Sequence, residues 1–224
     1  DGTLKTLGDI TITGDVKAAK AAQITSTVGD LSIAGNVDSA TGTTVQTSSD
    51  GTITVTGKLS TTNTASDKAG AVNVSTTGDN ITLAADSDDA GNDSIVSAGA
   101  VNVTAQGGTI SVQGDVQGAG AVQVTTTGDG TITLGSKVTA YDVSSTGNTT
   151  NVSTGTGDIT LYGTASSATG TTIQSTSGNI SVTGALNTSS ASGATGDVEA
   201  TTSGTISLTK HRRRHPADHQ QHGL

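Results

Sequence analysis

The first 209 residues of this 224-residue chain contain no cysteine, methionine, tryptophan, phenylalanine, arginine, histidine or proline. The lack of cysteine excludes disulfide bonds as a source of stability. The lack of large apolar side chains argues against a compact globule of this size, whose core normally depends on them. Glycine, threonine, serine, alanine and valine are abundant instead. This composition leaves either a disordered chain or an elongated repeat fold with a thin aliphatic core.

Basic side chains are also scarce. Residues 1–209 hold six lysines against eighteen acidic residues, a net charge of −12, and the whole chain carries −9. Repulsion from phosphate groups argues against nucleic acid or an anionic membrane as a partner. No apolar run approaches the 18 or so residues of a membrane-spanning helix, so we expect no membrane insertion. Because Asp1 falls within a repeated pattern, we expect the chain to be a piece of a longer protein.

One short motif recurs along the chain: an apolar residue, a serine or threonine, and a second apolar residue. The apolar pairs of its nine copies are Ile10/Ile12, Leu31/Ile33, Ile53/Val55, Ile81/Leu83, Ile110/Val112, Ile132/Leu134, Ile159/Leu161, Ile180/Val182 and Ile206/Leu208. Successive copies are 21 to 29 residues apart. Self-similarity at such a period predicts a solenoid.

A second apolar strand is expected before each later copy of the motif. Its last inward residues are predicted to be Ile24, Val45, Val74, Val103, Val124, Val152, Ile173 and Val198. Each lies seven or eight residues before the next motif, across a corner that contains glycine. The distance from the first apolar residue of a motif to the last inward residue of the strand that follows varies more, from 14 to 22 residues. This places four insertions at about 60–71, 84–100, 135–150 and 185–196, where they do not interrupt the two strands.

These patterns predict an all-β fold, a single-stranded parallel β-helix of eight to nine coils over residues 1–209. Strands alternate apolar and polar residues with period two, and no apolar stripe recurs at helical spacing. A disordered chain would not keep the second strand at so constant a distance from the motif. Eight coil intervals would give a rod about 40 Å long.

The alternation also predicts two outward columns of polar residues. The first consists of Thr11, Ser32, Thr54, Thr82, Ser111, Thr133, Thr160, Ser181 and Ser207. The second consists of Gln23, Thr44, Asn73, Asn102, Gln123, Asn151 and Thr172, with Asp197 at its end. Such ladders suit a solvated parallel sheet. Ice binding by a flat threonine face is an alternative, although the flanking positions vary.

The densest acidic cluster, "ADSDDAGND", contains Asp86, Asp88, Asp89 and Asp93. Clustered carboxylates suit Ca²⁺, so these four residues are a weak calcium candidate beside the simpler interpretation of a solvated loop. No other cofactor is predicted. A polysaccharide-active β-helix enzyme is an alternative function, but the body of the chain lacks histidine, arginine and most aromatic residues that such a groove would use. We therefore predict no enzymatic activity.

Residues 210–224, "KHRRRHPADHQQHGL", do not continue the repeat. Basic and histidine-rich segments can bind polyanions or metals. A frameshift is the other interpretation, because skipping one base in the Lys210 codon permits the translation "NTGGDIQLTTSNTG", which resembles the repeat. This favours a frameshift-derived, disordered tail without an evolved function.

The segments "GDITITGDV", "GTITVTGKL", "GTISVQGDV" and "GNISVTGAL" resemble the repeats of filamentous-haemagglutinin-like exoproteins and autotransporter passengers of Gram-negative bacteria. This resemblance implies a right-handed β-helix that acts as the stalk of a secreted or surface-displayed adhesin. The implied partner is a host or environmental surface, including carbohydrate. Exposed sheet edges would also let the fragment self-associate end to end.

Overall fold

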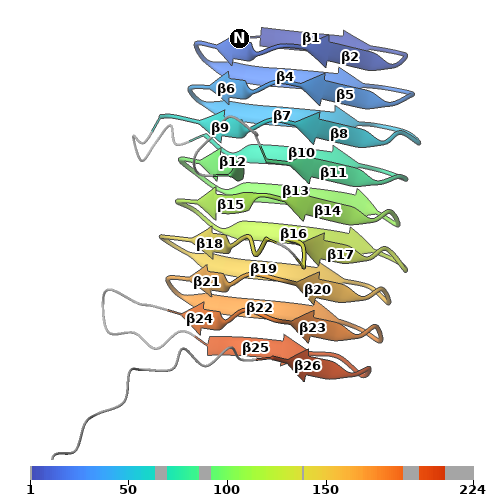
Figure 1. Cartoon of the computed structure of the whole chain (residues 1–224). Helices are drawn as coiled ribbons and strands as arrows, with labels where there is room; N and C mark the ends of the chain where they lie inside the picture. Colours follow the sequence, from blue (N-terminus) through green and yellow to red (C-terminus); the bar gives the residue numbers. More distant parts are fainter. Residues whose placement is uncertain (1, 64–69, 86–91, 138, 189–196, 210–224) are drawn as a thin grey trace, which may run out of the picture.

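The computed structural model describes residues 2–63, 70–85, 92–137, 139–188 and 197–209. These residues form 26 β-strands and no helix. The described part of the chain therefore has no helix able to cross a membrane. Figure 1 shows the strands wound into coils that stack along one axis. The predicted all-β parallel solenoid of eight to nine coils is confirmed.

The strands belong to three parallel sheets, which we call sheets A, B and C. Sheet A contains β1 (Gly2–Thr6), β4 (Ala21–Ser26), β7 (Gly42–Thr47), β10 (Val72–Thr76), β13 (Val101–Gln106), β16 (Val122–Thr127), β19 (Thr149–Thr154), β22 (Gly170–Ser175) and β25 (Asp197–Thr201). Sheet B contains β2 (Ile10–Thr13), β5 (Leu31–Ala34), β8 (Ile53–Thr56), β11 (Ile81–Ala84), β14 (Ile110–Gln113), β17 (Ile132–Leu134), β20 (Ile159–Leu161), β23 (Ile180–Val182) and β26 (Ile206–Leu208). Sheet C contains β3 (Val16–Ala18), β6 (Val37–Ser39), β9 (Leu59–Thr61), β12 (Asp93–Ser97), β15 (Asp115–Gly118), β18 (Val143–Ser145), β21 (Ala165–Ser167) and β24 (Leu186–Thr188).

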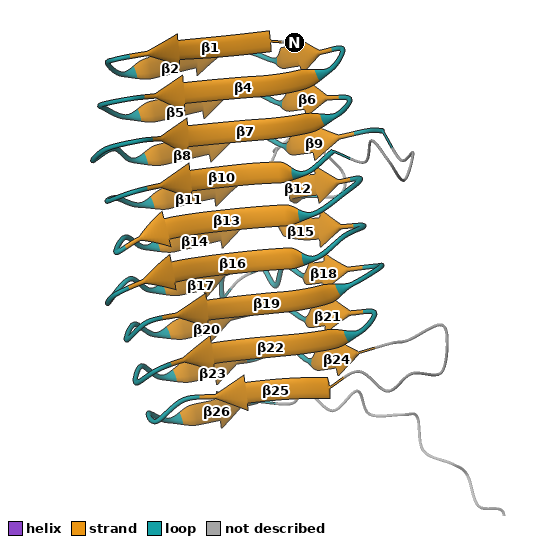
Figure 2. Cartoon of the chain, turned by 180° about the vertical axis from the view of Figure 1, so that it is seen from behind, coloured by secondary structure: helices purple, strands orange, loops and turns teal. Residues whose placement is uncertain are grey.

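Each coil passes from sheet A to sheet B to sheet C, and each strand pairs with the equivalent strand of the next coil. Sheet A lies behind sheet B in Figure 1 and in front of it in the reverse view of Figure 2. Seen from the N-terminal coil, the chain therefore turns clockwise as it recedes. This sense of winding makes the solenoid right-handed, as parallel crossover connections almost always are.

The core consists of columns of aliphatic side chains that stack from coil to coil. Both apolar positions of the repeated motif face inward from sheet B, and Ile53, Ile110 and Ile159 are fully buried there. Sheet A contributes the predicted column that includes Val45, and sheet C a third column that includes Leu59. Burial of small aliphatic side chains from three sides gives the thin core that the composition predicts.

The third side of each coil is more regular than predicted, since it also forms a sheet. Most sheet C strands are three residues long and have one inward apolar residue near their start. They are therefore too short to show the alternation of apolar and polar residues by which a strand is predicted from sequence. The stretches that separate successive strands of the described residues are correspondingly shorter than the predicted insertions: 62–71 between β9 and β10, 85–92 between β11 and β12, 135–142 between β17 and β18, and 189–196 between β24 and β25. All four lie next to sheet C in the chain, after or before one of its strands. The corner from sheet A to sheet B has three to five residues in every coil.

Sheet A also has one more column of inward side chains than predicted. It lies two positions after the column of Ile24 and Val45, which was expected to hold the last inward residue of each strand. Its buried members are Ser26, Thr47, Thr76, Ala105, Thr126, Thr154 and Ser175. The hydroxyl groups donate hydrogen bonds to glycine carbonyl oxygens at the corner; Ser26 bonds Gly8 at 2.9 Å and Thr154 bonds Gly130 at 2.6 Å. Burial of these polar groups is tolerated because each hydroxyl has a partner. The prediction that the inward residues of these strands end at Ile24, Val45 and their equivalents is therefore wrong.

The predicted register of the last coil is wrong by two residues. Ala200, and not Val198, continues the column of Ile173, and Glu199, and not Asp197, pairs with Thr172. A shift of two residues preserves which side chains face inward, so alternation cannot detect it. Pairing between β22 and β25 fixes the position instead.

Candidate functional site

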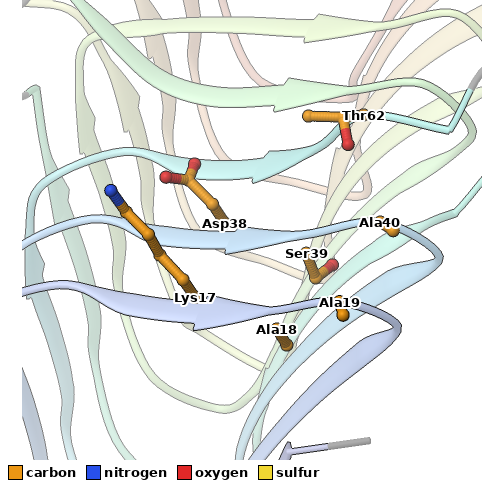
Figure 3. Close-up of a pocket in the computed structure, with 7 residues that line it drawn as sticks. All are labelled: Lys17, Ala18, Ala19, Asp38, Ser39, Ala40 and Thr62. Carbon is orange, nitrogen blue, oxygen red and sulfur yellow. The ribbon is translucent and has the colours of Figure 1, made fainter.

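A shallow hollow of about 500 Å³ lies on sheet C at the N-terminal end of the solenoid. Figure 3 shows Lys17 on β3 and Asp38 on β6 projecting to the same side of the sheet. The two residues are direct partners in the parallel pairing of these strands. Alanines 18, 19 and 40, together with Ser39 and Thr62, complete the lining. Thr62 also opens the first long insertion, so the hollow and the insertion share a border.

Hydrogen bonds hold the polar part of this hollow in place. Ser60, next in the column after Asp38, donates its hydroxyl to Asp38 Oδ1. Ser39 Oγ lies 3.0 Å from Thr43 Oγ1, and the backbone N–H of Thr62 donates to the Ser39 carbonyl. The lining thus offers one ammonium, one carboxylate and small methyl groups. Ammonium and carboxylate groups form hydrogen bonds with polar ligands, and Asp38 is the one carboxylate among the described residues of this lining.

Only Asp93 of the four predicted calcium ligands belongs to the described residues; Asp86, Asp88 and Asp89 lie outside them. Asp93 begins β12, and its Oδ1 accepts a hydrogen bond of 3.0 Å from Gln117 Nε2 on the next coil. Within the described part of the chain, no three acidic or histidine side chains gather as a metal site would require. Calcium binding by this cluster stays a prediction.

Both predicted outward columns run along the rod. The serine and threonine column on sheet B is continuous from Thr11 to Ser207 through direct strand pairing. On sheet A, Asn102 Nδ2 donates to Asn73 Oδ1 at 2.8 Å, which is the amide ladder expected of stacked asparagines. The two faces offer uncharged hydrogen-bonding groups over most of their length.

Two columns of corner Asp and Asn residues have a role that the sequence analysis missed. At the start of sheet B, Oδ1 of each residue accepts the backbone N–H of the equivalent residue in the next coil, at 2.6–3.1 Å; these residues are Asp9, Asp30, Asn80, Asp158 and Asn179. At the start of sheet C the same bond forms at 2.6–3.0 Å from Asp15, Asn36, Asp115 and Asp142. Their recurrence directly before the first inward apolar residue of a sheet B or sheet C strand is the signal that could have revealed this link between coils.

Asp115 is the member of these columns whose ionisation the fold alters. Burial raises the pKa of Asp115 above its ordinary value of 3.8. The hydrogen bond from the backbone N–H of Asp142 lowers the pKa in part, and the negative charge of Asp142 raises it further. The net effect is that the folded chain holds a proton on Asp115 more firmly than the unfolded chain does.

Stability is therefore expected to fall as the pH rises from about 4 through the folded pKa of Asp115, since the folded state binds more protons in that window. Asp115→Asn should remove this dependence and stabilise the protein at neutral pH, because Asn36 already accepts the same bond in this column. Asp115→Ala should instead cost about 1 kcal/mol by leaving the Asp142 N–H unpaired. Urea denaturation of the three proteins between pH 4 and 7 measures both effects. An Asp115→Asn protein with the wild-type pH profile would contradict the assignment.

Comparisons with models of protein families, with characterised proteins and with solved structures find no match to this chain.

Proposed function

We propose that the chain is a stalk segment of a secreted or surface-displayed bacterial adhesin, in which the loops beside sheet C make the attachment. One observation supports this most directly: all four long insertions flank sheet C, whereas the corner between sheets A and B never exceeds five residues. A rod with two uninterrupted faces and one loop-bearing side is suited to carrying variable segments along its length. Its stacked core tolerates insertions at these corners because strand pairing is unaffected.

Other features agree with this role. The hollow at Lys17 and Asp38 lies on the same sheet and borders the first insertion, so polar surface ligands, including carbohydrates, are the expected partners. The chain has no cysteine, which suits export in an unfolded state across a Gram-negative envelope. The repeats resemble those of filamentous-haemagglutinin-like exoproteins, which supports location outside the outer membrane.

The proposal predicts that surface binding depends on the insertions and not on the faces. Residues 63–69, 86–91, 136–141 and 189–196 would be replaced by glycine–serine segments of equal length, first together and then one at a time. Binding of the labelled full chain to epithelial cell layers and to immobilised polysaccharides would be compared with that of the variants. We expect the combined replacement to reduce binding at least tenfold.

A double variant, Asn102→Ser and Gln123→Ser, is the matched control, because both side chains face outward from sheet A on neighbouring strands. It should bind as the wild type does. Equal loss in the control and loop variants, or no binding by the wild type to any of these surfaces, would overturn the proposal. Release of new reducing ends from the polysaccharides would favour the enzyme alternative, and thermal hysteresis would favour ice binding.

A further inference from the structure

We propose that Tyr141 and Tyr162 form a binding site for a neutral glycan on the loop-bearing side of the rod. They are the only tyrosines, and the chain has no tryptophan or phenylalanine. The fold brings them together at the corner between sheets B and C, where Tyr141 lies between β17 and β18 and Tyr162 between β20 and β21, well inside the rod in Figure 1. The inference rests on the proposed function, since it names the class of ligand that the third insertion would contact.

The two tyrosines meet at Gly135. A Cβ on Gly135 would lie 3.1 Å from the Tyr162 Cβ and 3.2 Å from the Tyr141 backbone nitrogen. In the same way, a Cβ on Gly163 would clash with the Tyr141 carbonyl oxygen. Each tyrosine therefore lies directly against a glycine of the adjacent coil, and the absence of a side chain at both glycines lets the two tyrosines approach each other.

No side chain of its own column covers the ring of Tyr141. Strand pairing of β15, β18 and β21 makes Gly114 and Gly163 the equivalents of Tyr141 in the preceding and following coils. Both tyrosines are partly exposed, and neither phenol hydroxyl has a hydrogen-bond partner among the described residues. A ligand at this corner therefore finds apolar ring surface and two hydroxyl groups that are free to bond it.

Polar side chains lie beside the rings. Asp142 is exposed next to Tyr141, and its Oδ1 accepts the backbone N–H of Thr164 at 2.7 Å, which fixes the position of the carboxylate. Ser136 Oγ accepts the backbone N–H of Thr139 at 3.0 Å and so closes the turn that leads to Tyr141. A sugar ring has an apolar C–H face and a rim of hydroxyl groups. Tyrosine rings pack on such a face, while a carboxylate accepts hydrogen bonds from the rim.

Spacing and charge narrow the class of glycan. The two tyrosines belong to successive coils, so their backbones are about 4.8 Å apart along the rod axis. This is close to the length of one sugar unit in a β-1,4-linked chain of glucose or xylose, in which the equatorial hydroxyls leave both ring faces apolar. Such a chain lying along the rod would place neighbouring sugars on the two tyrosines. Residues 1–209 carry a net charge of −12, which repels chains of uronic acids or sulfated sugars.

Tyrosine fluorescence reports on this site alone, because the chain has no other tyrosine and no tryptophan. The full chain would be titrated with cellohexaose and with xylohexaose up to about 10 mM, which detects Kd values in the millimolar range. We expect a saturable change in tyrosine emission for the wild type with at least one of the two.

Two kinds of variant separate ring stacking from a structural effect. Tyr141→Gly and Tyr162→Thr copy the equivalent residues of the next coil, Gly163 and Thr183, so the fold should be retained, which circular dichroism would check. Each should weaken binding at least about tenfold, as reported by the remaining tyrosine. Tyr141→Phe and Tyr162→Phe keep the ring and should bind within about threefold of the wild type.

Thr56→Ala is the matched control, because Thr56 is exposed at the position of Tyr162 four coils earlier. It should bind as the wild type does. No saturable change with either hexasaccharide would overturn the proposal. Unaltered binding by Tyr141→Gly and Tyr162→Thr, or equally tight binding of a hexasaccharide from alginate, a chain of uronic acids, would also overturn it.

Failure of this site is distinguishable from failure of the proposed function. If Tyr141→Gly and Tyr162→Thr adhere to cell layers and polysaccharides as the wild type does, while the loop replacements do not, adhesion stands and the glycan site is wrong. If the wild type binds a hexasaccharide through its tyrosines but adheres to none of the surfaces, the glycan site stands and the adhesin function is wrong.

Discussion

Leu134→Ala is expected to lower the free energy of unfolding by about 2–5 kcal/mol, while Leu208→Ala should lower it by less than about 0.5 kcal/mol. The two leucines occupy the same column of sheet B. Leu134 is 1% exposed and stacked between Val112 and Leu161, whereas Leu208 is 59% exposed in the last coil. Truncation of Leu134 leaves a cavity closed by neighbours above and below. Truncation of Leu208 leaves no cavity.

Chemical denaturation followed by far-ultraviolet circular dichroism measures both effects in the full chain. In a stacked fold each coil contacts only its neighbours, so a weakened central coil affects both halves and a weakened last coil affects one. Equal losses for the two variants would contradict the stacking of this column. A Leu134→Ala loss below about 1 kcal/mol would mean that the core collapses around the missing side chain.

Gly157→Ala is expected to destabilise the protein by about 3 kcal/mol or more, because it forces two coils apart. A Cβ at position 157 would lie 2.1 Å from the Gly130 carbonyl oxygen and 2.6 Å from its carbon, both backbone atoms of the preceding coil. The same oxygen accepts the buried Thr154 hydroxyl at 2.6 Å. Relief of the clash therefore disturbs that hydrogen bond as well as the strand pairing.

Gly170→Ala is the matched control for this prediction. Its added Cβ would have no neighbour closer than 3.6 Å, and its strand partner Thr149 already carries a side chain at this position. We expect stability to be unchanged or raised by up to about 1 kcal/mol, because alanine restricts the unfolded chain. The urea midpoints of Gly157→Ala and Gly170→Ala, each compared with that of the wild type, measure both effects. Similar losses at both positions would show that glycine is needed for backbone freedom rather than for close approach of the coils.

The hollow at Lys17 and Asp38 could not be found from sequence, because its lining comes from three successive coils. Residues 17, 38 and 62 have no local relation in the chain, and they come together only when β3, β6 and β9 stack. The acidic cluster at 86–93 was noticed because its members are close in sequence. Closeness in sequence says nothing about whether oxygen atoms converge on one point, as a cation would require.

The amino-acid sequence by itself determined the coil. Nine copies of one motif, period-two alternation and a nearly constant distance to the preceding strand predicted the parallel stack and most inward residues, since these properties depend on local chain geometry. Tertiary structure alone decided the third sheet, the two-residue register of β25, the buried hydroxyl column and the corner hydrogen bonds. Those features depend on which atoms meet between coils some 18 to 29 residues apart. Alternation fixes the face of the sheet on which a side chain lies. Only pairing with the neighbouring coil fixes the side chain's position along the strand and the residue with which it pairs.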